Sequence, residues 1–183
     1  NALARQGFEI SELEQSGLMG HKVVLIGGSD IPAYRQMSLV TADILNRVGF
    51  KVDMQLSDWG SVAARRAKKD PPDQGGWNVF HTSANGAQLA SPLTSPSTIM
   101  TCDGRNFVGW PCDQVGEDMR QAYIREADPA KQKALIEKMH ARLWETLPYV
   151  PLGQFRQPFL WRNDVTGVVK ANTLVFWNID KTA

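Results

Sequence analysis

Lys22-Val23-Val24-Leu25-Ile26 is an almost wholly apolar run, and the turn residues Gly27-Gly28-Ser29-Asp30 follow it directly. A short run of this kind is typical of a strand that is buried on both faces of a parallel sheet. Pro32 comes next, at a position that the first turn of a helix tolerates. The sequence therefore predicts a strand, a turn and a helix in succession, which is the beginning of an α/β fold.

Two further strands are predicted downstream, separated by helices. The first helix should end at Gly49 and bury an apolar face at helical spacing; that face consists of Met37, Val40, Ile44, Leu45 and Val48. Residues 50–56 alternate apolar and polar side chains, which predicts a half-buried strand, and a helix capped by Ser57 or Asp58 should follow. Residues 77–82 are the third predicted strand. A β-α-β-α-β order with short links predicts a parallel sheet with right-handed crossovers over residues 20–82.

In the second half of the chain, the sequence predicts two helices and an edge strand. One helix should run from Asp113 to about Ala127 and the other from Pro129 to Pro148. Tyr149-Val150-Pro151-Leu152 resembles a strand at a sheet edge, because prolines flank and interrupt it.

The bulk composition suits one globular domain with almost no net charge. Of 183 residues, 43% are hydrophobic and 21% are charged, and the formal net charge is +1. We therefore expect no attraction to nucleic acid or to anionic lipid. No apolar stretch reaches the roughly 20 residues that a membrane span requires. The densest basic run, Arg65-Arg66 with Lys68-Lys69, is interpreted as a solvated helix end, where cations favour the helix dipole; a phosphate site is the alternative.

The third strand runs into the small, polar, glycine-containing stretch 82–87. An α/β domain builds a ligand-facing crevice in this way, at the carboxyl end of a strand. Ser83, Asn85 and Gln88 are therefore candidate polar contacts for a ligand. His81 ends the strand, and it either points into the crevice or packs within the sheet.

Trp110 is the candidate aromatic contact. It stands between Gly109 and Pro111, where a flat ring can stack on a ligand rather than fill a core. Burial of the ring in the core is the alternative. Cys102 and Cys112 enclose this loop, and their closeness suits a disulfide in an oxidising compartment, contributing on the order of 2–3 kcal/mol. Two free buried thiols in a reducing cytosol are the competing interpretation.

The sequence contains little evidence for metal binding, cofactor binding or catalysis. The three histidines are scattered without a ligand spacing, and the two cysteines lack the C-x-x-C arrangement, so we expect no metal. The turn at residues 27–30 lacks both the dinucleotide fingerprint and the phosphate-loop lysine, so we expect no cofactor. A hydrolase would have to use His81 with a serine such as Ser83, but the G-x-S-x-G elbow is missing. We do not expect an enzyme.

Three stretches, taken in order, resemble a known family. They are residues 82–92, Phe107-Val108-Gly109-Trp110-Pro111 and residues 149–155. They are similar to the carboxyl-terminal part of the extracellular solute-binding proteins of family 5, the bacterial ABC-transporter receptors for peptides, nickel complexes and related solutes. The likeness runs from about Gly20 to the end of the chain.

The resemblance implies a fold and a division of the chain. The expected fold is an α/β lobe of the type II periplasmic-binding-protein kind, with a parallel-rich sheet flanked by helices. Residues 20–152 would be the carboxyl-terminal lobe of a two-lobed protein, and residues 153–183 would return toward the missing first lobe. Residues 1–19 are interpreted as a linker or as a remnant of an expression vector.

The resemblance also implies a function. Such a protein captures a peptide-like or other small solute in the periplasm, between this lobe and the amino-terminal lobe, and delivers it to permease subunits in the membrane. A periplasmic address favours the Cys102–Cys112 disulfide. A small α/β hydrolase and the ligand-sensing lobe of a cytoplasmic regulator stay open as alternatives.

One position departs from the pattern of peptide-binding members. In those members an aspartate after the third strand pairs with the amino terminus of the peptide, and Gln88 stands at the matching position here. Glutamine carries no charge and cannot form the charge-assisted bond that an ammonium group favours. The departure favours a neutral or anionic solute, or one that is held mainly by aromatic contact.

Overall fold

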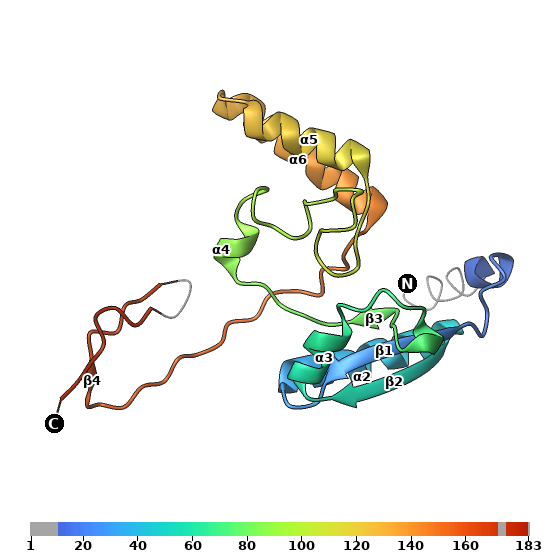
Figure 1. The fold of residues 1–183 in the computed structure, drawn as a ribbon, viewed down its shortest axis with the longest axis horizontal. Helices are drawn as coiled ribbons and strands as arrows, with labels where there is room; N and C mark the ends of the chain where they lie inside the picture. Colours follow the sequence, from blue (N-terminus) through green and yellow to red (C-terminus); the bar gives the residue numbers. More distant parts are fainter. Residues whose placement is uncertain (1–10, 172–174, 183) are drawn as a thin grey trace. The chain divides into compact units, whose positions relative to one another are not determined.

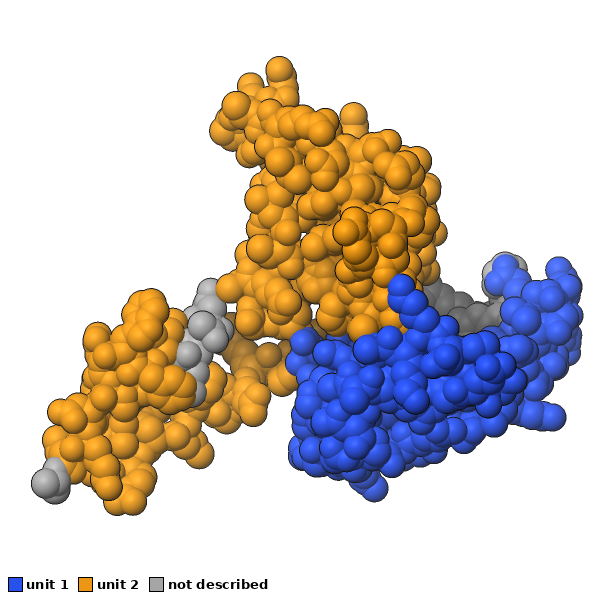
Figure 2. Space-filling model, in the orientation of Figure 1, with its two compact units in different colours: residues 1–83 blue, residues 84–183 orange. Residues whose placement is uncertain are grey.

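A computed structural model describes residues 11–171 and 175–182, and Figure 1 draws its ribbon. The chain forms two compact units, residues 1–83 and 84–183, which Figure 2 colours separately. The predicted linker of residues 1–19 lies partly outside the described residues, and within it residues 11–15 are helical.

Three parallel strands form the sheet of unit 1, in the order β2-β1-β3. They are β1 (Lys22–Gly28), β2 (Lys51–Ser57) and β3 (Val79–Phe80). The predicted parallel β-α-β-α-β arrangement is thereby confirmed. β3 is shorter than the predicted strand at residues 77–82. Just before it, Val24 N donates to Asn78 Oδ1 at 2.8 Å, and Asn78 N donates to Val24 O at 2.9 Å.

Helices α2 (Pro32–Val48) and α3 (Trp59–Arg65) cover the two faces of this sheet. On one face, Val24 and Ile26 pack with Val62 of α3. On the other face, α2 lies against β1 so closely that a Cβ at Gly27 would collide with the side chain of Ser38. Only glycine permits this approach. Both faces of β1 are therefore covered, as its continuous apolar run predicts.

Helix α2 ends as predicted, but it buries a different face. Gly49 adopts the left-handed conformation at φ 115° and terminates the helix. The buried residues of α2 are Tyr34, Ser38 and Ala42, whereas Val40 is 57% exposed and Ile44 is 47% exposed. The predicted apolar face is therefore wrong for Val40 and Ile44, whereas Met37, Leu45 and Val48 are half-buried. The close contact at Gly27 selects a small side chain for the centre of the interface, and that choice sets the rotation of the helix.

The interpretation of the basic run as a solvated helix end is wrong for Arg65. Its guanidinium turns back onto the protein, where Nη1 donates to Gln55 Oε1 at 2.5 Å and Nη2 donates to Gly76 O at 2.9 Å. Arg65 thus ties α3 to β2 and to the segment after the 3₁₀ turn η1 (Pro72–Gln74).

Unit 2 is built mainly from helices and loops. It contains α4 (Gly86–Leu89), α5 (Gln114–Arg125) and α6 (Pro129–Thr146), and a short antiparallel pair of β4 (Val165–Thr166) with β5 (Asp180–Lys181). Both long helices confirm the sequence prediction, and they pack against each other. The predicted edge strand at residues 149–152 is wrong, because no strand forms there. Proline has no N–H to donate to a ladder, and two prolines stand in or beside this stretch.

A disulfide and an ion pair hold the loops of unit 2 to its helices. Cys102 and Cys112 are bonded, with Sγ–Sγ 2.08 Å, which confirms the predicted pairing. At the start of α5, Asp113 accepts two hydrogen bonds from Arg142 of α6, at 2.7 Å and 3.0 Å. These bonds from the guanidinium hold the pKa of the Asp113 carboxyl below its usual range.

Protonation of Asp113 should weaken unit 2 in acid. A carboxyl with a depressed folded-state pKa contributes stability above its ordinary pKa of 3.8, and that contribution is lost as the pH falls through the lower folded value. Asp113→Asn should therefore lower the thermal midpoint at neutral pH, and the difference from the parent should shrink below pH 3.8. Asp118→Asn, on the exposed side of the same helix, is the matched control and should change little. A constant difference at every pH would contradict this role for Asp113.

Candidate functional site

The carboxyl ends of the three strands of unit 1 lie at one edge of the sheet. The chain passes from β1 to β2 on one side and then crosses to β3 on the other, so the strand order reverses between β1 and β3. Open α/β sheets bind ligands outside the carboxyl ends of their strands, at such a reversal. Ser29, Trp59 and Ser83 stand at or close after the ends of β1, β2 and β3. We therefore take this edge as the candidate site of unit 1.

Tyr34 of α2 contacts two residues of this edge, Ser83 and Trp59. Its hydroxyl lies 2.8 Å from Ser83 Oγ, and its ring centre lies 4.7 Å from that of Trp59 at a tilt of 52°. Trp59 is fixed in turn, since its backbone N–H donates to Asp30 Oδ1 at 2.8 Å. Tyr34 is 8% exposed and therefore a rigid support. The predicted site residue Ser83 is thus exposed and held in place from α2.

A guanidinium lies over the aromatic side chains near this edge. The Cζ of Arg66 is 5.2 Å from the ring centre of Trp59 and 5.8 Å from that of Phe80. Both distances fall within the range of cation–π contact. The sequence interpretation of Arg66 as part of a solvated helix end is therefore wrong. Two signals could have identified the pair: Trp59 follows the end of a predicted strand, and Arg66 comes two helical turns later on the same face.

His81 has the geometry of the packed strand histidine that the sequence left as one alternative. It is 7% exposed, with Nδ1 at 3.2 Å from Ser38 Oγ and Nε2 at 2.9 Å from Thr41 Oγ1. Burial lowers the pKa of the imidazole, which favours its neutral form. The neighbouring hydroxyl of Ser38 is fully buried and donates to Tyr34 O, so it is not placed to attack a substrate. A direct contact of His81 with a solute stays a prediction.

Asn85 and Gln88 lie together in unit 2, at the short helix α4. Asn85 is the N-cap, and its Oδ1 accepts a hydrogen bond from Gln88 N at 2.8 Å. The main-chain oxygen of Gln88 accepts a further bond from Thr94 Oγ1 at 3.0 Å. Both side chains are exposed. The main chain of Gln88 is therefore held by a capped turn, while the side-chain oxygen of Asn85 is engaged in making that turn.

Trp110 lies in the loop that the disulfide closes, on a different segment of unit 2. Its φ of 45° places it in the left-handed region, at a cost of roughly 1–2 kcal/mol for a residue other than glycine. The loop is held from within, because Asn106 Nδ2 donates to Thr101 O at 3.1 Å and also to Pro111 O. Backbone strain of this kind clusters at functional sites, and it supports the prediction that Trp110 contacts a ligand.

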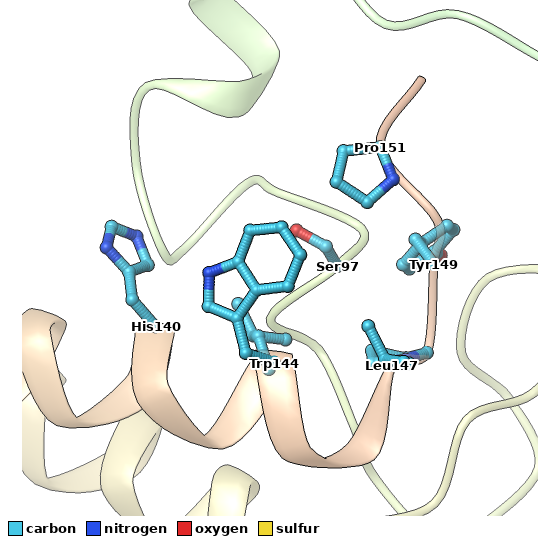
Figure 3. Close-up of a pocket in the computed structure, with 8 residues that line it drawn as sticks. Ser97, His140, Trp144, Leu147, Tyr149 and Pro151 are labelled. Carbon is cyan, nitrogen blue, oxygen red and sulfur yellow. The ribbon is translucent and has the colours of Figure 1, made fainter. Parts of the chain in front are cut away.

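A separate apolar pocket of about 180 Å³ opens at the end of α6. Figure 3 shows His140, Trp144 and Leu147 from the helix end, facing the loop that carries Ser97 and the segment with Tyr149 and Pro151. Tyr149 donates to Pro96 O at 3.2 Å, and burial raises its pKa to about 12. None of the ligand-binding residues predicted from the sequence lines this pocket. It was missed because its walls come from three stretches that no motif connects.

The predicted site residues thus fall into two groups. Ser83 and His81 lie in unit 1, where both are bonded to α2. Asn85, Gln88 and Trp110 lie in unit 2, the first two at α4 and the third in the disulfide loop. Within the described ranges, no three His, Cys, Asp or Glu side chains come together to hold a metal ion. The same residues contain no helix long and apolar enough to cross a membrane.

Comparison with known proteins begins with sequence. No protein-family model matches the chain. The probable peptide ABC transporter periplasmic-binding protein y4tO of Sinorhizobium fredii is 31% identical over 168 residues, which make up 92% of this chain and 32% of that protein. The chain therefore spans about a third of the length of this curated relative.

Solved structures of periplasmic binding proteins share the fold. The ABC transporter-associated protein DppA of Helicobacter pylori, in complex with the peptide STSA, matches with a TM-score of 0.68 at 18% identity over 95% of this chain and 34% of its own. AgaA of A. tumefaciens R10, in complex with agropinic acid, matches with a TM-score of 0.60 at 19% identity over 76% of this chain and 28% of its own. These likenesses confirm the predicted α/β lobe. The chain is thus similar over most of its length to part of a probable peptide ABC transporter periplasmic-binding protein, in agreement with the resemblance to family 5 solute-binding proteins that the sequence predicts.

Proposed function

We propose that this chain is the carboxyl-terminal lobe of a periplasmic receptor that captures a small solute for an ABC importer. Residues 20–152 form the lobe, and residues 153–183 return toward the amino-terminal lobe of the same protein. Closure of two lobes around a solute shifts an equilibrium between open and closed forms, and permease subunits in the membrane recognise the closed form. The Cys102–Cys112 disulfide supports a periplasmic location, because disulfides persist in oxidising compartments.

The observation that carries the proposal is the carboxyl edge of the unit 1 sheet. There an exposed serine hydroxyl, a tryptophan ring and a guanidinium occupy the crevice position of an open α/β sheet: Ser83, Trp59 and Arg66. Ligand pockets combine apolar surface with a few oriented polar groups in this way. The hydroxyl and the ring are held by the buried Tyr34, so little conformational entropy is lost when a solute binds.

The charges of these residues favour a neutral or anionic solute. In unit 1, the guanidinium of Arg66 can pair with a carboxylate through charge-assisted hydrogen bonding, while the nearby carboxyl of Asp30 is engaged with Trp59 N. In unit 2, Gln88 offers no negative charge to an ammonium group. The relatives differ in what they hold: one structure contains a peptide and another contains agropinic acid. We propose a small carboxylate-bearing solute, with peptide-like compounds among the candidates.

Arg66→Gln in the full-length protein tests this assignment. A lost charge-assisted hydrogen bond should weaken binding of a carboxylate solute by about 1.5–3 kcal/mol, measured by calorimetry over a panel of peptides, opines and sugars. Lys68→Gln, on the exposed stretch just after α3, is the matched control and should bind as the parent does. If the panel produces no binding heat with the parent receptor, the proposed function fails. If Arg66→Gln binds as tightly as the parent, the assignment of the anion contact fails.

Trp110→Ala separates the two interpretations of this ring. As a stacked anchor, Trp110 should contribute on the order of 1–3 kcal/mol to solute binding, and the thermal midpoint should change little. Trp144→Ala, which removes a tryptophan that is 67% exposed on α6, should leave binding unchanged. A large fall in the thermal midpoint, with normal affinity in the remaining folded protein, would instead identify Trp110 as core.

Gln88→Asp tests whether this position faces the solute. A carboxylate here should raise affinity for solutes that carry a free ammonium group, because a charge-assisted bond becomes available. The same solutes with an acetylated amino group are the control and should show no gain. Equal affinity of both receptors for the free amine would mean that Gln88 does not contact it.

A further inference from the structure

Asn85-Gly86 is the only Asn-Gly pair in the sequence, and it lies in the segment that follows β3. We propose that Asn85 is a site of spontaneous deamidation, which adds a negative charge to this segment as the protein ages. The co-reactant is water, and no enzyme is required.

The reaction uses the main-chain nitrogen of Gly86 as the nucleophile. After losing its proton, this nitrogen attacks Cγ of Asn85 and closes a five-membered succinimide. The bond from Cγ to Nδ2 breaks, and ammonia leaves with the proton. Water then adds to one of the two ring carbonyls: opening at Cγ yields aspartate, and opening at the main-chain carbon yields isoaspartate. Glycine favours ring closure, because it has no Cβ and its backbone turns freely.

The local structure leaves room for this reaction. Asn85 and Gly86 are both exposed, and a Cβ placed on Gly86 would meet no atom within 4 Å. The Oδ1 of Asn85 accepts the bond from Gln88 N, which draws electron density from Cγ while engaging the oxygen that stays rather than the nitrogen that leaves. Helix α4 has only 4 residues, so opening it to reach the attacking geometry costs little free energy.

Other amides in the chain are held more firmly and serve as internal controls. Asn46 lies within α2 and accepts from Val52 N, Asn78 accepts from Val24 N, and Asn106 Nδ2 donates to Thr101 O. Each precedes a larger residue than glycine. Their surroundings differ from those of Asn85 in the two features that the reaction requires, namely a following glycine and an open backbone.

Asp103-Gly104 is the other pair with a following glycine, and its carboxyl group is in a different state. Asp103 Oδ1 accepts from Arg105 N at 3.1 Å and from Thr101 Oγ1 at 2.9 Å, and these bonds lower the pKa of the carboxyl. An ionised carboxylate is a poor electrophile toward the main-chain nitrogen. We therefore expect Asn85, rather than Asp103, to be the reactive position.

The aspartate product would keep the local structure and change its charge. Aspartate is as good an N-cap as asparagine, so α4 should persist. The new carboxylate lies three residues before Gln88, in a segment of otherwise uncharged side chains from His81 to Thr101. If this segment contacts the solute, which rests on the proposed function, deamidation would shift preference from anionic toward cationic solutes.

The test is to incubate the full-length protein in warm, mildly alkaline buffer and to map its peptides by mass spectrometry. The peptide with Asn85 should acquire the mass change of NH2 to OH, and protein isoaspartate methyltransferase should label it. Asn46, Asn78 and Asn106 should stay unchanged, and fragment spectra should separate Asn78 from Asn85, since no Lys or Arg lies between them. Gly86→Ala, which fits the open space at this position, should slow the change several-fold.

Two results would overturn the proposal. One is that Asn85 persists in the folded protein while the same peptide deamidates when it is free in solution. The other is that Gly86→Ala reacts as fast as the parent. Asn85→Asp in the full-length receptor tests the consequence separately, through its affinity for anionic and cationic solutes. If affinities are unchanged although the mass change occurs, the modification site stands and only the solute contact of this segment is refuted.

Discussion

The close approach of α2 to β1 at Gly27 is the contact on which the candidate site of unit 1 depends. Because position 27 has no side chain, Ser38 lies directly against the strand and is fully buried. That contact sets the rotation of α2, and the rotation brings the Tyr34 hydroxyl to Ser83 and the Ser38 hydroxyl to His81. A larger residue at position 27 would push the helix away and disturb packing, the hydroxyl support and the crevice edge together.

The described part of unit 2 has no comparable sheet and relies on other restraints. The disulfide closes the loop around Trp110, and the Asp113–Arg142 pair fixes the end of that loop to α6. Hydrogen bonds of this charge-assisted kind are stronger than neutral ones and more directional. They let a loop carry a strained residue such as Trp110, whose left-handed backbone would otherwise relax. The two units are thus ordered by different physical means.

The guanidinium of Arg66 is the charged group on which the proposed solute class rests. It is oriented over two aromatic rings in unit 1, and we propose that it pairs with a carboxylate of the solute. Against this background the chemistry of Asn85 matters, because a single deamidation would place an anion in an uncharged segment. Selectivity in such a receptor would depend on very few charges.

The sequence by itself determined the α/β class and the parallel direction of the strands, because strand periodicity and short links are local. It favoured a bond between the two cysteines but left free thiols open, and the structure decided for the bond. The sequence also indicated the segment after β3 as a crevice edge. Tertiary structure alone decided which face of α2 is buried, since that choice depends on a glycine in another element. It likewise decided that Arg66 lies over Trp59 and that both nitrogens of His81 are engaged. Periodicity reports how apolar a face is, whereas the fit between two surfaces decides which face is used.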